Sequence, residues 1–107
     1  MVYISCIILL NFSIVIRSFK DRRTERFFKG KRIHAFQGFV NQATRRLTIL
    51  DNAVSLHDLS ALHSNHLESL SGDRVGRYSI RINRQWRLCF RWQDDGPYDV
   101  EITDYHS

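Results

Sequence analysis

The stretch from Gly72 to Trp92 constrains the fold more than any other part of the chain, because its residues alternate in polarity on both sides of a turn near Asn83-Arg84. Period-two alternation places apolar side chains on one face of a strand and polar side chains on the other. The stretch therefore predicts two strands joined by a tight turn, with a helical layer over their apolar face. The residues expected on the covered face are Tyr78, Ile80, Ile82, Trp86, Leu88, Phe90 and Trp92.

The opposite face of the two strands is predicted to be rich in arginine. Guanidinium groups present a fixed fork of donors that suits phosphate oxygens, and they also stack on bases. A solvated basic surface that binds nothing gives the same pattern, but two adjacent strands of the same polarity favour an RNA-binding face. The side chains expected to contact RNA are Arg74, Arg77, Arg81, Arg84 and Arg91, and Arg87 shares their face.

Two helices are predicted before this stretch. Asp21 is a suitable N-cap for a helix through Lys29, Gly30 is a suitable stop, and Phe27 and Phe28 are expected to point inward. A second helix is expected from His34 to about Leu50, because apolar residues recur there at steps of three and four. Its inward stripe comprises Phe36, Phe39, Val40, Ala43, Leu47 and Leu50.

The remaining segments complete an α+β chain. Residues 15–19 are predicted to form a first strand and residues 66–70 a short strand before the Gly72 turn. Residues 51–65 are expected to form a polar connection with apolar contacts from Val54, Leu56, Leu59 and Leu62. After a turn at residues 94–97, Tyr98, Val100 and Ile102 alternate with polar residues as a last strand. This order predicts an antiparallel-rich sheet with helices on one face.

Composition limits the range of functions. The 107 residues suit one domain with a modest core, and the formal net charge of +5 favours a polyanionic partner, nucleic acid first, or an acidic protein. Cys6 and Cys89 have no metal-ligand spacing and form no disulfide framework, which is typical of a reducing cytoplasm. His57, His63 and His66 match no zinc pattern, so no metal or cofactor is predicted.

Residues 68–90, ESLSGDRVGRYSIRINRQWRLCF, together with the closing Asp104-Tyr105-His106, resemble the HigB branch of the RelE/ParE toxin superfamily. The motifs are Gly-Asp-Arg, the Asn-x-Gln-Trp-Arg turn and strand, and the final Asp-Tyr-His. The resemblance covers Val15 to His106 and implies a RelE/ParE-like fold, a twisted antiparallel-rich sheet with two N-terminal helices packed on one face.

The first fourteen residues stand outside this resemblance. They are apolar and uncharged, too short for a membrane span, and lack the positive segment of a signal peptide. The family typically opens Met-Ile-x-Ser-Phe, and residues 15–19, Val-Ile-Arg-Ser-Phe, stand in that place. Residues 1–14 are therefore expected to precede the true start, with residues 15–107 as the toxin domain; a genuine extra strand or apolar arm is the alternative.

The resemblance implies a ribosome-dependent endoribonuclease that works without a metal, stops translation and arrests growth. Such cleavage needs a base, an acid and fixed positive charge at the phosphate. The family's site carries over to Arg87, Asp104, Tyr105 and His106, and Glu68 is a candidate general base. Strongly active relatives have a histidine and a lysine where this chain has Glu68 and Ser71, which predicts weaker activity.

The resemblance also implies the partners. A HigA-type helix-turn-helix antitoxin is expected to neutralise the protein in the cytoplasm, with ribosome and mRNA as targets and operator DNA bound only through the antitoxin complex. No membrane association is expected. Two alternatives keep the same fold: a ParE-like inhibitor of DNA gyrase, and a degenerate toxin that serves as a protein-binding module.

Overall fold

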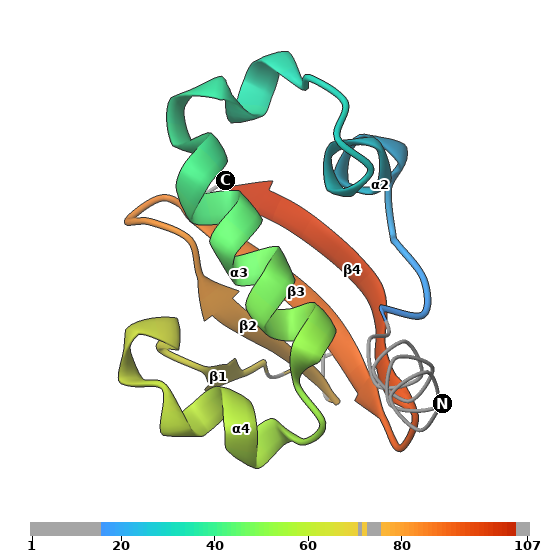
Figure 1. Cartoon of the computed structure of the whole chain (residues 1–107). Coiled ribbons are helices and arrows are strands. Elements are labelled where there is room, and N and C mark those ends of the chain that lie inside the picture. Colours follow the sequence, from blue (N-terminus) through green and yellow to red (C-terminus); the bar gives the residue numbers. More distant parts are fainter. Residues whose placement is uncertain (1–15, 71, 73–75, 105–107) are drawn as a thin grey trace, which may run out of the picture.

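Four antiparallel strands form one sheet in the order β1-β2-β3-β4 in the computed structural model, which describes residues 16–70, 72 and 76–104. The strands are β1 (Glu68–Ser69), β2 (Arg77–Arg81), β3 (Trp86–Gln93) and β4 (Gly96–Asp104). The helices are α2 (Arg22–Phe28), the 3₁₀ helix η1 (His34–Phe39), α3 (Val40–Asn52), α4 (Leu56–Ala61) and the 3₁₀ helix η2 (His63–Asn65). Figure 1 shows α3 crossing one face of the sheet with α2 on the same side beside β4, which confirms the predicted α+β class.

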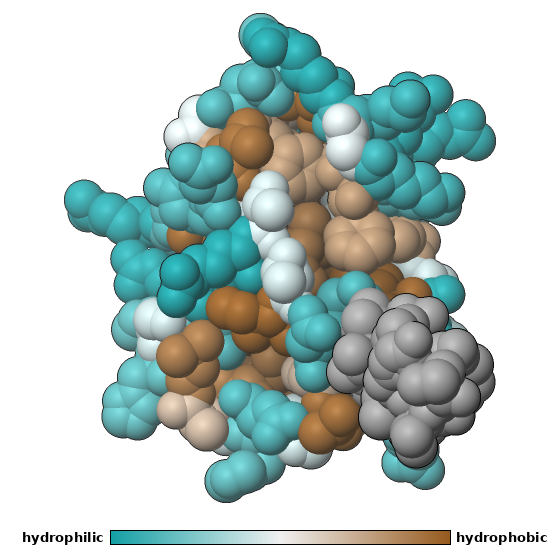
Figure 2. All heavy atoms as spheres, in the orientation of Figure 1, coloured by the Kyte–Doolittle hydropathy of each residue, from teal (hydrophilic) through white to brown (hydrophobic). Residues whose placement is uncertain are grey.

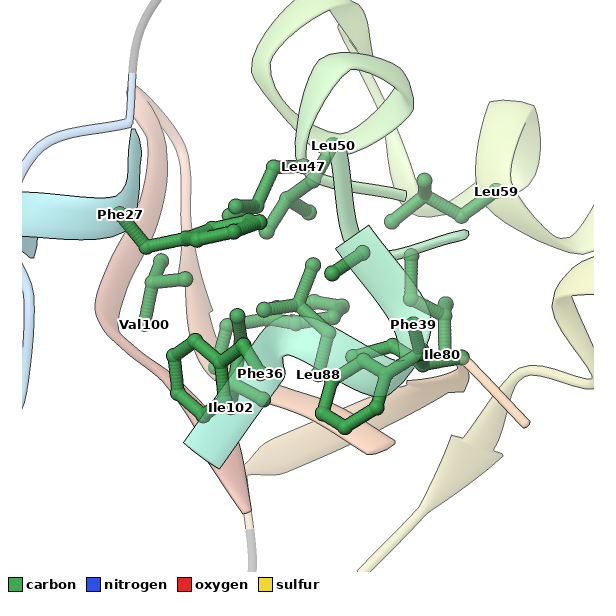
Figure 3. Packing of buried hydrophobic residues seen from close by; sticks show 13 residues of the cluster. Phe27, Phe36, Phe39, Leu47, Leu50, Leu59, Ile80, Leu88, Val100 and Ile102 are labelled. Atoms are coloured by element: carbon green, nitrogen blue, oxygen red, sulfur yellow. The ribbon is translucent and has the colours of Figure 1, made fainter. Parts of the chain in front are cut away.

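The core lies between the helices and the face of the sheet that they cover, called here the inner face (Figure 3). Ile80, Leu88 and Phe90 are fully buried there, and Ile82 is 6% exposed. The helical stripe predicted from sequence meets them, because Phe36, Ala43 and Leu50 are also fully buried. The partly buried side chains packed against this cluster include Tyr78, Trp86 and Trp92. The predicted inward residues of the central hairpin are thus confirmed.

The ends of α2 follow the predicted capping chemistry. The Asp21 Oδ1 atom accepts a hydrogen bond from the Thr24 amide at 3.0 Å, which satisfies one of the free N–H groups of the first turn. At the other end, Gly30 has a φ of +95°, a left-handed conformation that glycine adopts without strain. Its N–H donates to the Phe27 carbonyl and the Lys31 N–H donates to the Arg26 carbonyl, the Schellman arrangement that closes a helix.

Two helical predictions need correction. Phe28 is 38% exposed and contacts only the edge of the core through Phe19, whose ring centroid lies 5.5 Å away. The single helix predicted from His34 is broken at Phe39, whose φ of −146° separates η1 from α3. The break lets Phe36 and Phe39 both pack near Trp86, with ring centroids 5.8 and 5.0 Å from it.

The predicted polar connection contains a helix of its own. The Ser55 hydroxyl accepts from the Asp58 amide at 3.2 Å and caps α4, a six-residue helix too short for periodicity to reveal. Of the four apolar residues expected to contact the core, Leu59 is fully buried and Leu56 partly so. Val54 is 69% exposed and Leu62 38% exposed, so two of the four expected contacts are wrong.

The first predicted strand is reduced to one bridge in the described residues. Phe19 pairs with Val100 in parallel, and the Arg17 and Lys20 amides donate to the carbonyls of Pro97 and Val100 at 2.8 and 2.9 Å. Residues 1–15, and with them the expectation about the start of the chain, lie outside the described residues. Within the described part of the chain, no helix is long and apolar enough to cross a bilayer.

A bulge interrupts the alternation predicted for the last strand. Cys89 pairs with Glu101, but Arg91 pairs with Tyr98, so β4 carries one extra residue in this interval. Asp99 lies there with a φ of +54°. Tyr98 consequently shares the face of Arg91, whose guanidinium carbon lies 5.2 Å from its ring centroid, while Val100 and Ile102 remain fully buried as predicted.

Thr24 ties α2 to the sheet, and its removal is expected to be costly. Its buried Oγ1 accepts a hydrogen bond from the Ile102 amide at 3.0 Å. Thr24→Val keeps the shape of the side chain but leaves that N–H without its partner, so the free energy of unfolding should fall by about 1–3 kcal/mol. Urea denaturation followed by circular dichroism measures it. Thr24→Ser, which keeps the hydroxyl, should lose less; equal losses for both variants would contradict the role of the hydrogen bond.

Candidate functional site

Arg87 lies on the face of the sheet opposite α3, called here the outer face. It pairs with Arg81 of β2 and Thr103 of β4. Its Nε donates to Ser79 Oγ at 2.7 Å, and its Nη2 donates to the carbonyls of His66 and Ser79. The residue is only 6% exposed, so the expectation of an exposed arginine free to reach RNA is wrong. The cross-strand hydroxyl and carbonyls draw the guanidinium down onto the sheet.

Two residues that hold Arg87 were not predicted from the sequence to have this role. Ser79 is fully buried on β2, where it appeared only as one polar residue among arginines. His66 contributes its main chain rather than its imidazole: it has a left-handed φ of +46°, its N–H donates to the His63 carbonyl, and its own carbonyl accepts from Arg87. The alternation at residues 77–81 places Ser79 on the arginine face, but no sequence pattern identifies the His66 carbonyl.

Glu68 and Arg81 share the outer face with Arg87. Glu68 lies directly opposite Ser79 in the β1–β2 pairing, and directly opposite residues project to the same face. Glu68 is exposed. Arg81 lies directly opposite Arg87 and is half-buried, and its Nε donates to the Asn83 carbonyl at 3.3 Å. The structure thus brings together one carboxylate and two guanidinium groups of the predicted set.

Asp104 does not project to the same face. It pairs with Trp86, whose ring packs against Phe39 on the inner face, whereas Arg87 pairs with the preceding residue, Thr103. Neighbouring residues of a strand point to opposite faces. The Asp104 carboxylate accepts a hydrogen bond from Gln85 Nε2 at 2.7 Å, at the turn between β2 and β3. Asp104, which the resemblance assigns to the site together with Arg87, thus projects from the other face of the sheet.

Carboxylates of β4 lie among the predicted RNA-binding arginines. Arg91 Nε lies 3.0 Å from Asp99 Oδ2, and Arg77 lies 3.8 Å from both Asp99 and Glu101. The RNA-binding face was predicted from β2 and β3, and the bulged β4 brings these acidic residues alongside their arginines. Arg77 and Arg91 consequently have internal partners on the outer face.

The remaining predicted residues lie at the end of the hairpin or outside the described residues. Arg84 is exposed in the turn before β3, where Asn83 Oδ1 accepts from the amides of Gln85 and Trp86. Arg74, Tyr105 and His106 fall in the segments that the structure does not describe, and so does Ser71. Among the described residues, no group of three or more His, Cys, Asp or Glu side chains is placed to hold a metal ion.

Two pKa values near these elements are shifted. The hydrogen bond from the Tyr98 hydroxyl to Asp95 Oδ2, 2.7 Å long, raises the pKa of Tyr98 above its usual value. Burial, followed by repulsion from Arg45, lowers the pKa of Arg46, whose Nη1 donates to Asn65 Oδ1 at 2.7 Å. Arg46 and Arg87 bond consecutive residues, Arg46 from α3 to the Asn65 side chain and Arg87 from β3 to the His66 carbonyl.

Comparison with known proteins gives consistent results. A family model described as the RelE-like toxin of type II toxin–antitoxin system HigB matches residues 17–106. The Toxin HigB-1 of Vibrio cholerae serotype O1 is 38% identical over 78 residues, which are 71% of this chain and 82% of that protein. The Endoribonuclease HigB of Proteus vulgaris is 30% identical over 93 residues, which are 86% of this chain and 100% of that protein.

One solved structure supports the fold. A chain of the YoeB-YefM complex from Staphylococcus aureus superposes with a TM-score of 0.52 at 18% sequence identity, covering 87% of this chain and 99% of that one. At this identity the likeness concerns the arrangement of helices and strands alone. It agrees with the RelE-like sheet and helices predicted from the sequence.

Arg87 should contribute to stability as well as to any activity. Charge-assisted hydrogen bonds contribute about 1.5–3 kcal/mol each, and Arg87→Ala also leaves the buried Ser79 hydroxyl without this donor. The free energy of unfolding in urea should therefore fall by at least that amount. Arg45→Ala is the matched control, because it removes one exposed positive charge from α3, and such surface changes usually stay within about 0.5 kcal/mol. Equal losses for the two variants would contradict the anchoring role of Arg87.

Proposed function

Because this chain belongs to the HigB family of RelE-like toxins of type II toxin–antitoxin systems, we propose that it is a toxin that cleaves mRNA on the ribosome and so stops translation. The observation that carries the proposal is a guanidinium group held in place on the outer face of a RelE-like sheet. Arg87 donates to Ser79 and to the His66 carbonyl. The full-length similarity to the Proteus vulgaris endoribonuclease supports the same reaction.

Arg87 is proposed to supply fixed positive charge to the phosphate under attack. Its bonds to β2 and to the segment before β1 restrict the rotation of the side chain. A donor that is already in position stabilises a transition state without reorganisation during the reaction. The low exposure of Arg87 suits a charge fixed beneath the phosphate rather than a mobile clamp at the surface.

The proton transfers are assigned to residues around Arg87. Glu68 is proposed as the base that activates the ribose 2′-hydroxyl, because it is exposed on the same face of the sheet. His106 is proposed as the acid that protonates the leaving 5′-oxygen, and Tyr105 as the group that stacks on a base. Asp104 is proposed to act through its hydrogen bond with Gln85, which fixes the end of β4 just before these two residues.

The proposed partners follow from the family. We propose an antitoxin of the HigA type, with a helix-turn-helix, encoded beside the toxin, and contact with operator DNA only as part of the toxin–antitoxin complex. The similar solved structure is itself a complex, of YoeB with YefM, which supports a partner protein of this kind. The site of action would be the cytoplasm, where ribosomes and mRNA are found.

Substitution of Arg87 tests the proposed site directly. Arg87→Ala should lower the rate of mRNA cleavage on programmed ribosomes about a hundred- to thousandfold, the usual effect of removing a donor that stabilises the transition state. Arg87→Lys should restore little, since an ammonium group cannot donate to Ser79 and to a phosphate through one planar fork. The assay is run at a temperature at which circular dichroism shows each variant folded.

Arg46→Ala is the control for this experiment. It makes the same change in charge and also removes a hydrogen bond to the η2 segment, but from α3 on the inner side of the sheet. Its cleavage rate should stay within a few-fold of that of the wild type. If folded Arg87→Ala protein cuts at the wild-type rate, Arg87 is not part of the site.

Dependence on the ribosome is a separate prediction. The purified protein should cut mRNA bound to ribosomes and leave the same mRNA intact in free solution. In cells, induction should first reduce the incorporation of labelled amino acids, with DNA synthesis falling later. Early loss of DNA synthesis with translation intact would instead support a ParE-like inhibitor of gyrase.

A further inference from the structure

A groove runs between the end of α2 and the start of α3. It has a volume of about 310 Å³, and Phe27 and Val40 form its apolar floor. Its other lining residues are Gly30, Lys31, Arg32, Gln37 and Thr44. The Schellman turn at Gly30 directs the chain from the end of α2 into the groove wall. Such a volume lies near the lower end of roughly 300–1,000 Å³ for ligand pockets, enough for a few anchoring side chains.

The segment that contributes the two cations of the groove is strongly basic. Residues 20–32 contain seven Lys or Arg and two Asp or Glu, so this segment has a formal charge of +5, the same as the whole chain. Lys20, Arg23 and Lys29 form ion pairs. Lys31 and Arg32 are exposed and make no ion pair with any carboxylate in the described residues. Lys31 and Arg32, which form no ion pair within the described residues, thus lie beside the apolar floor of the groove.

The groove is separate from the proposed nuclease site. Its floor belongs to the helical layer over the inner face, because Phe27 is part of the core and Val40 packs against it. Arg87 lies on the outer face, across the sheet. A molecule seated in the groove therefore does not need to touch Arg87. Figure 2 shows apolar atoms exposed between the side chains of α3 and the hydrophilic side chains around α2.

We propose that this groove is the docking site for an acidic amphipathic segment of the antitoxin, an inference that rests on the proposed function. Carboxylates of the segment would pair with Lys31 and Arg32, while its apolar residues would cover Phe27 and Val40. An RNA strand fits this surface less well, because single-stranded RNA is held by stacking on exposed aromatic faces. Phe27, the one aromatic residue of the groove, is only 9% exposed.

The test measures binding of the purified antitoxin from the adjacent reading frame by isothermal titration calorimetry. The variant K31E/R32E reverses the two cations, and Thr44→Trp fills the groove at an exposed helical position without changing charge. Each should weaken binding about tenfold or more, because the first loses charge complementarity and the second removes the space for the side chains. The matched control R22E/R45E makes the same change in charge at two exposed positions outside the groove and should stay within about threefold.

Cleavage of mRNA on programmed ribosomes is measured for the same proteins and should match wild type in all of them. Wild-type affinity in K31E/R32E or in Thr44→Trp would overturn the docking site while leaving the nuclease intact. Loss of cleavage with retained antitoxin binding would assign the groove to RNA and would also overturn the docking site.

The wild-type protein separates this inference from the proposed function. If it cuts mRNA but does not bind the neighbouring protein, the antitoxin part of the proposed function fails together with this inference. If it binds but does not cut, only the nuclease part fails.

Discussion

The structure depends on a central strand that is buried on both faces. Leu88 and Phe90 are fully buried against the helices, while Arg87 and Cys89 are 6% and 4% exposed on the other face. β3 also has neighbours at both edges, β2 and β4. A shift of one residue would exchange its two faces and place guanidinium groups in the core, so the register is strongly fixed. The faces on which Arg87 and Asp104 lie follow from this register.

The elements with a clear period could be predicted from the sequence, and features set by neighbouring strands could not. Alternation identified the central hairpin, and the helical stripe through Ala43 and Leu47 identified the core face of α3. The burial of Arg87 depends on Ser79 and on a carbonyl reached from another part of the chain. The face of Asp104 depends on its pairing with Trp86, and the orientation of Tyr98 on a bulge. The burial of Arg87, the face of Asp104 and the orientation of Tyr98 all depend on how neighbouring segments pair. The alternation within one strand does not specify that pairing.

The distribution of charge divides the molecule into two surfaces with different properties. On the outer face, Arg77 and Arg91 have carboxylate partners on β4. The excess positive charge lies instead in residues 20–32, next to the groove. Long-range attraction of an acidic protein is therefore centred on the helical side, whereas the fixed, short-range donors of Arg87 lie on the sheet. The charge that would attract a partner and the residue proposed to bind the phosphate thus lie on opposite sides of the sheet.

The extended segment beside β4 has a consequence for how any protein can bind. An open strand edge offers main-chain donors and acceptors to almost any extended peptide, with little regard for its sequence. Here the Arg17 amide and the Ser18 carbonyl already bond Pro97 and Val100, which closes that length of the β4 edge. At the opposite edge, β1 has only two residues. Within the described residues the sheet therefore offers only short edges to a foreign strand, which favours recognition of a partner through its side chains, a mode of binding that discriminates between related sequences.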